Sequence, residues 1–175
     1  MATKPETPLR TYFTMGAQLA NQSGVLDQVK KRVPEADQRT VLVKILTPHP
    51  EVSHYIPDWL RLYAQGKMKP GSVSEEIFTI FMDPKANKIG ITDSWRVPEH
   101  TVTFLIEENT CWSIAARKET VFTAYHKGYP LRVIGDFKLR DMELVDEILR
   151  IIFEALKAEG KDLSELFRGI ADGSP

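Results

Sequence analysis

A single cysteine, Cys111, is the only one in the chain, so an intrachain disulfide is impossible. A reducing compartment is the simplest interpretation of such a sequence. No apolar run approaches the roughly 18 residues that a membrane-spanning helix requires. Residues 1–8 are polar and lack the apolar centre of a signal peptide. We therefore expect a cytoplasmic protein, or a module of something larger, with no membrane partner.

The usual signatures of nucleotide, metal and nucleophile chemistry are also missing. The sequence has no glycine loop for phosphates, no dinucleotide fingerprint, no zinc-ligand spacing, no nucleophile elbow and no helix-turn-helix signature. These absences disfavour a nucleotide-dependent enzyme and a sequence-specific DNA reader. We expect no cofactor and no metal.

The composition that remains is that of an ordinary globular protein. Of 175 residues, 42% are hydrophobic and 27% are charged, which suits one domain that can bury a core without disulfides or metals. We assign residues 9–170 to this domain, with a loose segment at 1–8 and a tail at 171–175. The formal net charge is −1, so the molecule as a whole is not attracted to polyanions.

Helical periodicity marks the first part of the chain. Apolar residues recur at helical spacing over 9–31, with a break near Ser23 and Gly24, and Pro34 stops the second segment. A further short helix is expected to begin at Pro57 and to end before Gly66.

The last part of the chain contains the clearest helix. It covers residues 141–158, with Asp141 at its start, an apolar stripe that includes Ile152, and Gly160 at its end. A second, shorter amphipathic helix is expected over 162–170.

The middle of the chain favours strands. The segment 40–46 fits either a strand or a buried helix, and we favour a strand because its residues are β-branched and apolar. The other segments are close together in sequence and separated by tight turns, which is typical of antiparallel pairing. The expected strands are 77–82, 88–92, 101–107, 111–116, 120–125 and 131–134. The sequence therefore predicts an α+β fold with N-terminal helices, an antiparallel meander sheet of about five strands, and two C-terminal helices packed on it.

Charge is distributed unevenly along the chain. Between residues 111 and 140 six basic residues face two acidic ones, whereas from 141 to the end nine acidic residues face four basic ones. We favour solvated faces, with some pairing between sheet and helix, as the explanation of this pattern. The alternative is a basic surface for an anionic substrate.

One candidate site lies in the segment from His49 to His54. Two imidazoles and the carboxylate of Glu51 fall within six residues, a combination suited to general acid–base chemistry near pH 7. The spacing is unsuited to zinc, and Pro50 should keep a regular helix from placing both rings on one face. The alternative interpretation is a proline-rich linker with histidines at its surface.

A second candidate site lies in the expected hairpin after Cys111. Arg117 and Lys118 form its basic tip, and Thr123, Tyr125 and His126 follow on the returning strand. Such a group could hold a phosphate and move a proton. An ordinary hairpin with a basic tip is the alternative.

The order of elements resembles the barnase–EndoU–colicin–RelE superfamily of small ribonucleases. The segment from His49 through Tyr55 to Pro57 looks like the stretch that precedes the sheet in some members, and Val121–Tyr125 is similar to their closing strand. The resemblance covers residues 40–130 at most. It implies a metal-independent ribonuclease in which the 2′-hydroxyl of RNA attacks the adjacent phosphate.

Carried over by position, the resemblance implies a role for each candidate residue. His49 or His54 would be the acid or base, with Tyr125 and Thr123 near the scissile group, and Arg117 or Lys118 would clamp the phosphate. Apart from the resemblance, His126 is a candidate substrate contact because it could pair with Arg117 in the expected hairpin.

Two functions therefore follow from the sequence. The first is a toxin-like endoribonuclease with RNA as its partner. The second is a non-catalytic protein-binding or adaptor domain, which would use its sheet face or its C-terminal helices to bind a protein or a second copy.

Overall fold

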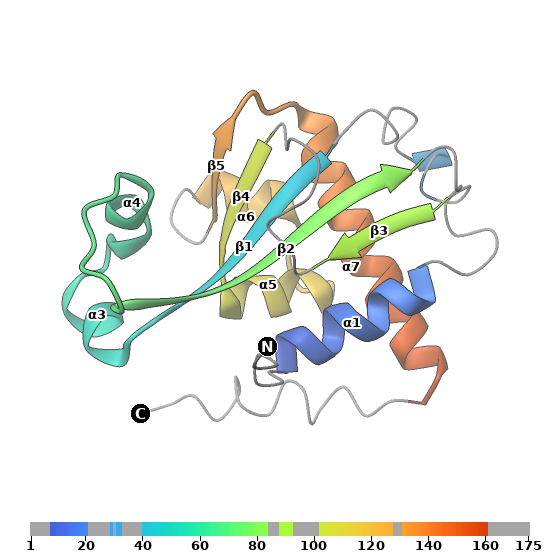
Figure 1. The fold of residues 1–175 in the computed structure, drawn as a ribbon, viewed down its shortest axis with the longest axis horizontal. Helices are drawn as coiled ribbons and strands as arrows, with labels where there is room; N and C mark the ends of the chain where they lie inside the picture. The colour runs from blue at the N-terminus through green and yellow to red at the C-terminus, as the bar shows by residue number, and fades with distance from the viewer. Residues whose placement is uncertain are drawn as a thin grey trace, which may run out of the picture.

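The computed structural model describes residues 8–20, 29, 31–32, 40–83, 88–92, 102–127 and 131–160 (Figure 1). The expected break near Ser23, the helix at 162–170 and both termini lie outside these residues. The described elements are α1 (Pro8–Ala20), β1 (Thr40–Pro48), α3 (Pro50–Tyr55), α4 (Trp59–Ala64), β2 (Val73–Asp83), β3 (Lys88–Thr92), β4 (Val102–Glu107), α5 (Glu108–Ala115), α6 (Val121–Lys127), β5 (Leu131–Gly135) and α7 (Leu139–Ala158).

The five strands form one mixed sheet in the order β3-β2-β1-β4-β5. Strand β1 is central and pairs antiparallel with β2 and parallel with β4. The α+β class is confirmed, but the antiparallel meander was wrong. Residues Phe104, Leu105 and Ile106 of β4 are buried although they point to alternate faces. Burial on both faces suits the interior of a sheet next to β1 and is typical of parallel pairing.

One face of the sheet packs against α1, α5 and α7. Val41, Val43 and Ile45 alternate along β1 and are buried in the core with residues of these helices. The ring of Phe13 on α1 stacks on Phe78 of β2, with centroids 4.0 Å apart. The guanidinium of Arg10 also donates to Glu76 on β2 at 2.7 Å, which ties α1 to the sheet.

The other face of the sheet is covered in part by α4. Trp59 and Leu60 of α4 form a second buried cluster with Leu46 of β1 and Leu105 of β4. Figure 1 shows α3 and α4 together at the left, apart from α1 and α7. The expected helix from Pro57 to Gly66 corresponds to α4, while α3 was not expected.

The predicted hairpin at 111–125 was wrong, because this segment forms α5 and α6. Thr110, Cys111, Ile114 and Ala115 are buried at helical spacing. Cysteine, tryptophan and isoleucine fit buried strands equally well, so the short apolar run was ambiguous.

The ends of α5 and α6 carry local signals. Arg117 follows α5 with φ 62°, and the amides of Arg117 and Lys118 donate to the carbonyls of Ile114 and Ser113. This is a Schellman motif with arginine in the left-handed position that glycine usually takes. Thr120 and Thr123 accept from each other's amides at 3.0 Å, which is a capping box at the start of α6.

Helix α7 is the long C-terminal helix that the sequence predicted. Its stripe is confirmed as core, since Val145, Ile148 and Ile152 have no exposed surface. The hydroxyl of Tyr12 on α1 donates to the carbonyl of Leu149 at 3.0 Å. The two helices therefore pack closely against each other on the same face of the sheet.

Close packing of α1 on α7 makes Gly16 sensitive to substitution. A Cβ at Gly16 would lie 2.6 Å from Cγ1 of Ile152, and overpacking of this kind costs about 1–3 kcal/mol. In an Ile152→Ala background that clash is removed, so only the higher helix propensity of alanine remains, worth about 1 kcal/mol. We predict that Gly16→Ala destabilises the wild type and stabilises Ile152→Ala, as measured by urea unfolding in a double-mutant cycle. The same effect in both backgrounds would contradict this packing.

Candidate functional site

Two pockets flank α3 and α4. The first, here called the sheet pocket, has a volume of about 510 Å³ and lies between α4 with its following turn and the face of β1, β4 and β5. Its lining residues are Leu42, Lys44, Tyr63, Ala64, Gly66, Met68, Thr103, Leu105 and Ile134. The second, here called the α3 pocket, has a volume of about 790 Å³. It is lined by Thr47, Pro48, Pro50, Glu51, Ser53, His54, Tyr55, Glu107, Glu108 and Asn109.

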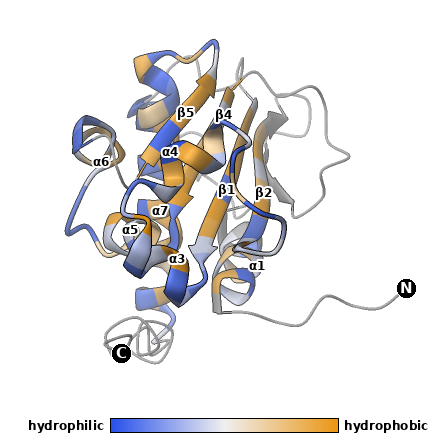
Figure 2. Cartoon of the chain, turned by 90° about the vertical axis from the view of Figure 1, so that its left-hand side faces the viewer, coloured by the Kyte–Doolittle hydropathy of each residue, from blue (hydrophilic) through white to orange (hydrophobic). Residues whose placement is uncertain are grey.

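The floor of the sheet pocket consists of side chains that point to the face of the sheet opposite the core. Leu42 and Lys44 point away from the core face that Val41, Val43 and Ile45 occupy. Register places Thr103 beside Leu42 and Leu105 beside Lys44. Figure 2 shows β1, β4 and β5 largely in hydrophobic colours, with α4 in front of them.

The turn after α4 forms the opposite wall of the sheet pocket. The amides of Gly66 and Lys67 donate to the carbonyls of Tyr63 and Leu62, both at 2.9 Å. Gly66 has φ +71°, so this turn is a Schellman motif with glycine in its usual place. The reversal of the chain brings Met68 back to the pocket that Tyr63 and Ala64 line.

The α3 pocket differs from the sheet pocket in its chemistry, because carboxylates line it. Thr47 donates to Glu108 at 2.6 Å. Burial raises the pKa of Glu107, and a hydrogen bond from Asn109 partly offsets this effect. No group of residues suited to a metal ion occurs within the described part of the chain.

Helix α3 explains the first candidate segment. His49 is its N-cap, and the Nδ1 atom of His49 accepts from the amide of Glu51 at 3.4 Å. Pro50 takes the first helical position, where its missing N–H costs nothing. The helix therefore begins at Pro50, and it includes His54 but not His49. His54 is exposed and its ring lies edge-on to Tyr55, with centroids 4.7 Å apart.

The second candidate group lies at the end of α5 and on α6. Arg117 and Lys118 are exposed in the turn between these helices. The ring of Tyr125 packs against that of Phe137, with centroids 5.4 Å apart. The ring of His126 packs edge-on against exposed Phe122, with centroids 4.3 Å apart. Thr123 is occupied in the cap of α6.

The structure does not bring these two groups into one cleft. His54 lines the α3 pocket, whereas Arg117, Tyr125 and the rest of the second group do not. Cys111, which the sequence did not favour as a nucleophile, is buried, and its burial raises the pKa of the thiol to about 12. A thiol of this kind is inert near neutral pH.

Sequence reasoning missed Lys44 and its neighbours. The signal was present in residues 40–46, where Lys44 is the one charged side chain in an apolar strand. Its significance depends on the central position of β1, which the sequence did not indicate.

Comparisons with known proteins concern the fold. The chain is similar to the apo form of Sterol Carrier Protein 2 from Yarrowia lipolytica, with a TM-score of 0.53, 10% identity, and coverage of 87% of this chain and 98% of that chain. The sterol carrier protein domain 2 of Helicoverpa armigera aligns with a TM-score of 0.47 at 14% identity, covering 85% and 94%. No family model matches the chain, and no curated protein matches it by sequence.

The proposed resemblance to small ribonucleases was wrong, because the structure has the fold of sterol carrier protein 2. The expected closing strand Val121–Tyr125 is helix α6, and the segment from His49 to Pro57 forms α3 after β1. The ribonuclease, toxin and hydrolase assignments and the RNA partner depended on that resemblance, and they fall with it. Within the described residues, no helix is long and apolar enough to cross a bilayer.

The raised pKa of Glu107 predicts a pH-dependent stability. Because burial disfavours its charged form, the cost of ionising it in the folded state is absent below the ordinary pKa of glutamate and is fully present above the raised pKa. We predict that Glu107→Gln is more stable than the wild type at pH 7 and that the difference shrinks as the pH falls toward about 4. Urea unfolding between pH 4 and pH 8 measures this, with Glu51→Gln as an equal change of net charge at an exposed position. A constant difference across that range would contradict the assignment.

Proposed function

We propose that this protein is a non-catalytic binding protein for a lipid-like ligand, which is held in the sheet pocket. The observation that carries the proposal is the apolar lining of this pocket. Six of its lining residues are apolar or aromatic: Leu42, Tyr63, Ala64, Met68, Leu105 and Ile134. Pockets of such volume and lining are typical of small-molecule sites. The similarity of the fold to a protein named as a sterol carrier supports the same class of ligand.

A hydrocarbon chain is the natural occupant of this surface. Each methylene moved from water into an apolar site contributes about 0.8 kcal/mol. Ile134 is 47% exposed at the rim of the pocket, so a ligand would cover apolar surface that now faces water. The α3 pocket is a poorer site for a hydrocarbon, because a hydrocarbon would take water from the carboxylates of Glu51, Glu107 and Glu108 and offer them no hydrogen bond.

The layer between the sheet and the helices is a rival position for a ligand. Large side chains fill this layer, among them Tyr12, Phe13, Phe104 and Trp112. Tyr12 lies edge-on to Trp112 at 5.1 Å, next to the stacked pair of Phe13 and Phe78. A ligand there would have to displace packed aromatic residues, which favours the sheet pocket.

Binding without catalysis follows from the polar groups of the sheet pocket. The polar side-chain groups in its lining belong to Lys44, Thr103 and Tyr63. A nucleophile with a general base and an orienting third group is not formed by these residues. The protein-binding alternative would use the sheet face or the C-terminal helices. The stripe of α7 is already used in the core, and the sheet face opposite that core holds the sheet pocket.

A blocking variant tests the proposal. Thr103 is partly buried on the floor of the sheet pocket, and an aromatic residue is well tolerated in a strand. We predict that Thr103→Trp lowers the affinity for Nile red, a neutral apolar dye, by at least about tenfold, which corresponds to 1.4 kcal/mol. Fluorescence titration measures the affinity. Thr14→Trp, the same substitution at an exposed position of α1, is the matched control and should bind as the wild type does.

Three results would overturn the proposal. The first is no binding of Nile red, dodecanoate or dodecan-1-ol by the wild type. The second is unchanged binding by a folded Thr103→Trp variant, which would move the ligand to the layer between sheet and helices. The third is an equal loss of binding in Thr14→Trp.

A further inference from the structure

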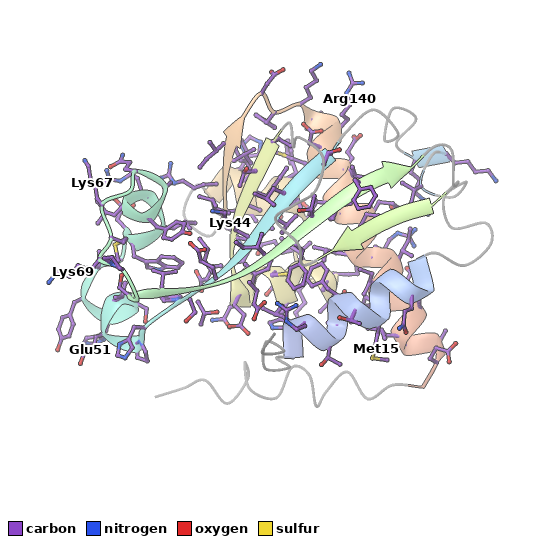
Figure 3. The ribbon with its side chains drawn as sticks, in the orientation of Figure 1. Met15, Lys44, Glu51, Lys67, Lys69 and Arg140 are labelled. Carbon is purple, nitrogen blue, oxygen red and sulfur yellow. The ribbon has the colours of Figure 1, made fainter. Side chains whose placement is uncertain are left out.

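The sheet pocket carries positive charge at an unusual place. Lys44 lies in the middle of β1, the central strand of the sheet, with Ile77 and Leu105 as its register neighbours. Its side chain is partly buried and lines the pocket (Figure 3). Lysine is seldom buried without a partner, because an ammonium group removed from water loses hydration.

A second cation lies on the same face of the sheet. Arg132 of β5 pairs in register with Leu105, so Lys44, Leu105 and Arg132 form one row across three strands. Lys44 and Arg132 lie two strands apart, so about 10 Å separates their Cα atoms. The Nε atom of Arg132 is buried and has no hydrogen-bond partner within the described part of the chain. Buried donors of this kind are rare in folded proteins, because an unpaired donor has lost its hydrogen bonds to water.

No ion pair joins either cation to an acidic side chain that the structure describes. The ion pairs among the described residues involve other arginines and lysines, such as Arg10 with Glu76 and Lys127 with Glu119. The lining of the sheet pocket contains no aspartate or glutamate. Glu75 and Glu107, the acids nearest in register on this face, flank Leu46, which lies one pleat further along β1.

From this juxtaposition of apolar walls with two cations that have no ion pair among the described residues, we propose that the ligand of the sheet pocket is an amphiphile with an anionic head group. The hydrocarbon chain lies on Leu42, Leu105, Met68 and Ile134, and Lys44 binds the head group, with Arg132 beside it. The inference rests on the proposed function and adds selection by charge at the same site. Hydrogen bonds between ionised partners in such a site are stronger than neutral ones.

The experiment compares ligands that share one chain and differ in head group. Dodecanoate, dodecan-1-ol and dodecyltrimethylammonium compete with bound Nile red at pH 7.4, below their aggregation limits. We expect the wild type to prefer dodecanoate over dodecan-1-ol by about tenfold and to bind the ammonium compound most weakly. Lys44→Gln should abolish the preference for dodecanoate while dodecan-1-ol still binds. Lys44→Arg should retain the preference, and Arg132→Gln should reduce it.

Lys67 supplies the matched control. It is exposed in the turn after α4 and does not line the pocket, so Lys67→Gln removes the same charge near the same helix. This variant should keep the preference for dodecanoate. Circular dichroism melting of each variant shows that the protein is folded.

Two classes of failure are distinguishable. Equal affinity of the wild type for dodecanoate and dodecan-1-ol would overturn the inference and leave the proposed function standing. The same holds if Lys44→Gln keeps the preference, which would mean that Lys44 only extends to water past an apolar wall. Failure of every ligand to displace Nile red from a protein that binds it would overturn the inference as well. Failure of the wild type to bind any of these compounds would overturn both.

Discussion

The register of β1 is the constraint on which the rest of the structure depends. Because β1 is central and its side chains alternate between faces, Val41, Val43 and Ile45 must serve the core while Leu42, Lys44 and Leu46 face α4 and the pocket. A shift of one residue would place Lys44 in the core and Val43 in the pocket. The same strand therefore fixes both the stability of the fold and the chemistry of the candidate site.

As a result, helices cover the two faces of the sheet to different extents. On the core face, α1, α5 and α7 pack so closely that Gly16 has no room for a methyl group next to Ile152. On the other face, the short helix α4 covers only the part around Leu46 and Leu105, and its glycine turn at Gly66 leaves a hollow beside it. A closely packed face beside a partly covered one is a reasonable basis for binding a ligand without disturbing the core.

Much of the fold could be predicted from local pattern. The stripe around Ile152 predicted α7, and the β-branched run at 40–46 predicted β1, because periodicity reports burial directly. The strand order could not be predicted, since the pairing of β1 with β4 joins residues about sixty positions apart. The segment 111–125 was misassigned because a short apolar run fits strand and helix, and its decisive signal was the capping pair Thr120 and Thr123. The site could not be predicted either. Lys44 has meaning only beside Leu105 and Arg132, which a linear pattern does not place together.

The position of a bound ligand on one or the other face of the sheet tests the proposed binding site most directly. Methyl NMR spectra recorded during titration with dodecanoate would report on each side of the sheet separately. A ligand in the sheet pocket should shift the signals of Leu42, Met68, Leu105 and Ile134, which line it, with little change for Val43, Ile148 and Ile152 in the core. Large shifts of the core methyl groups, with those of the pocket unaffected, would place the ligand between the sheet and the helices. That result would contradict binding in the sheet pocket.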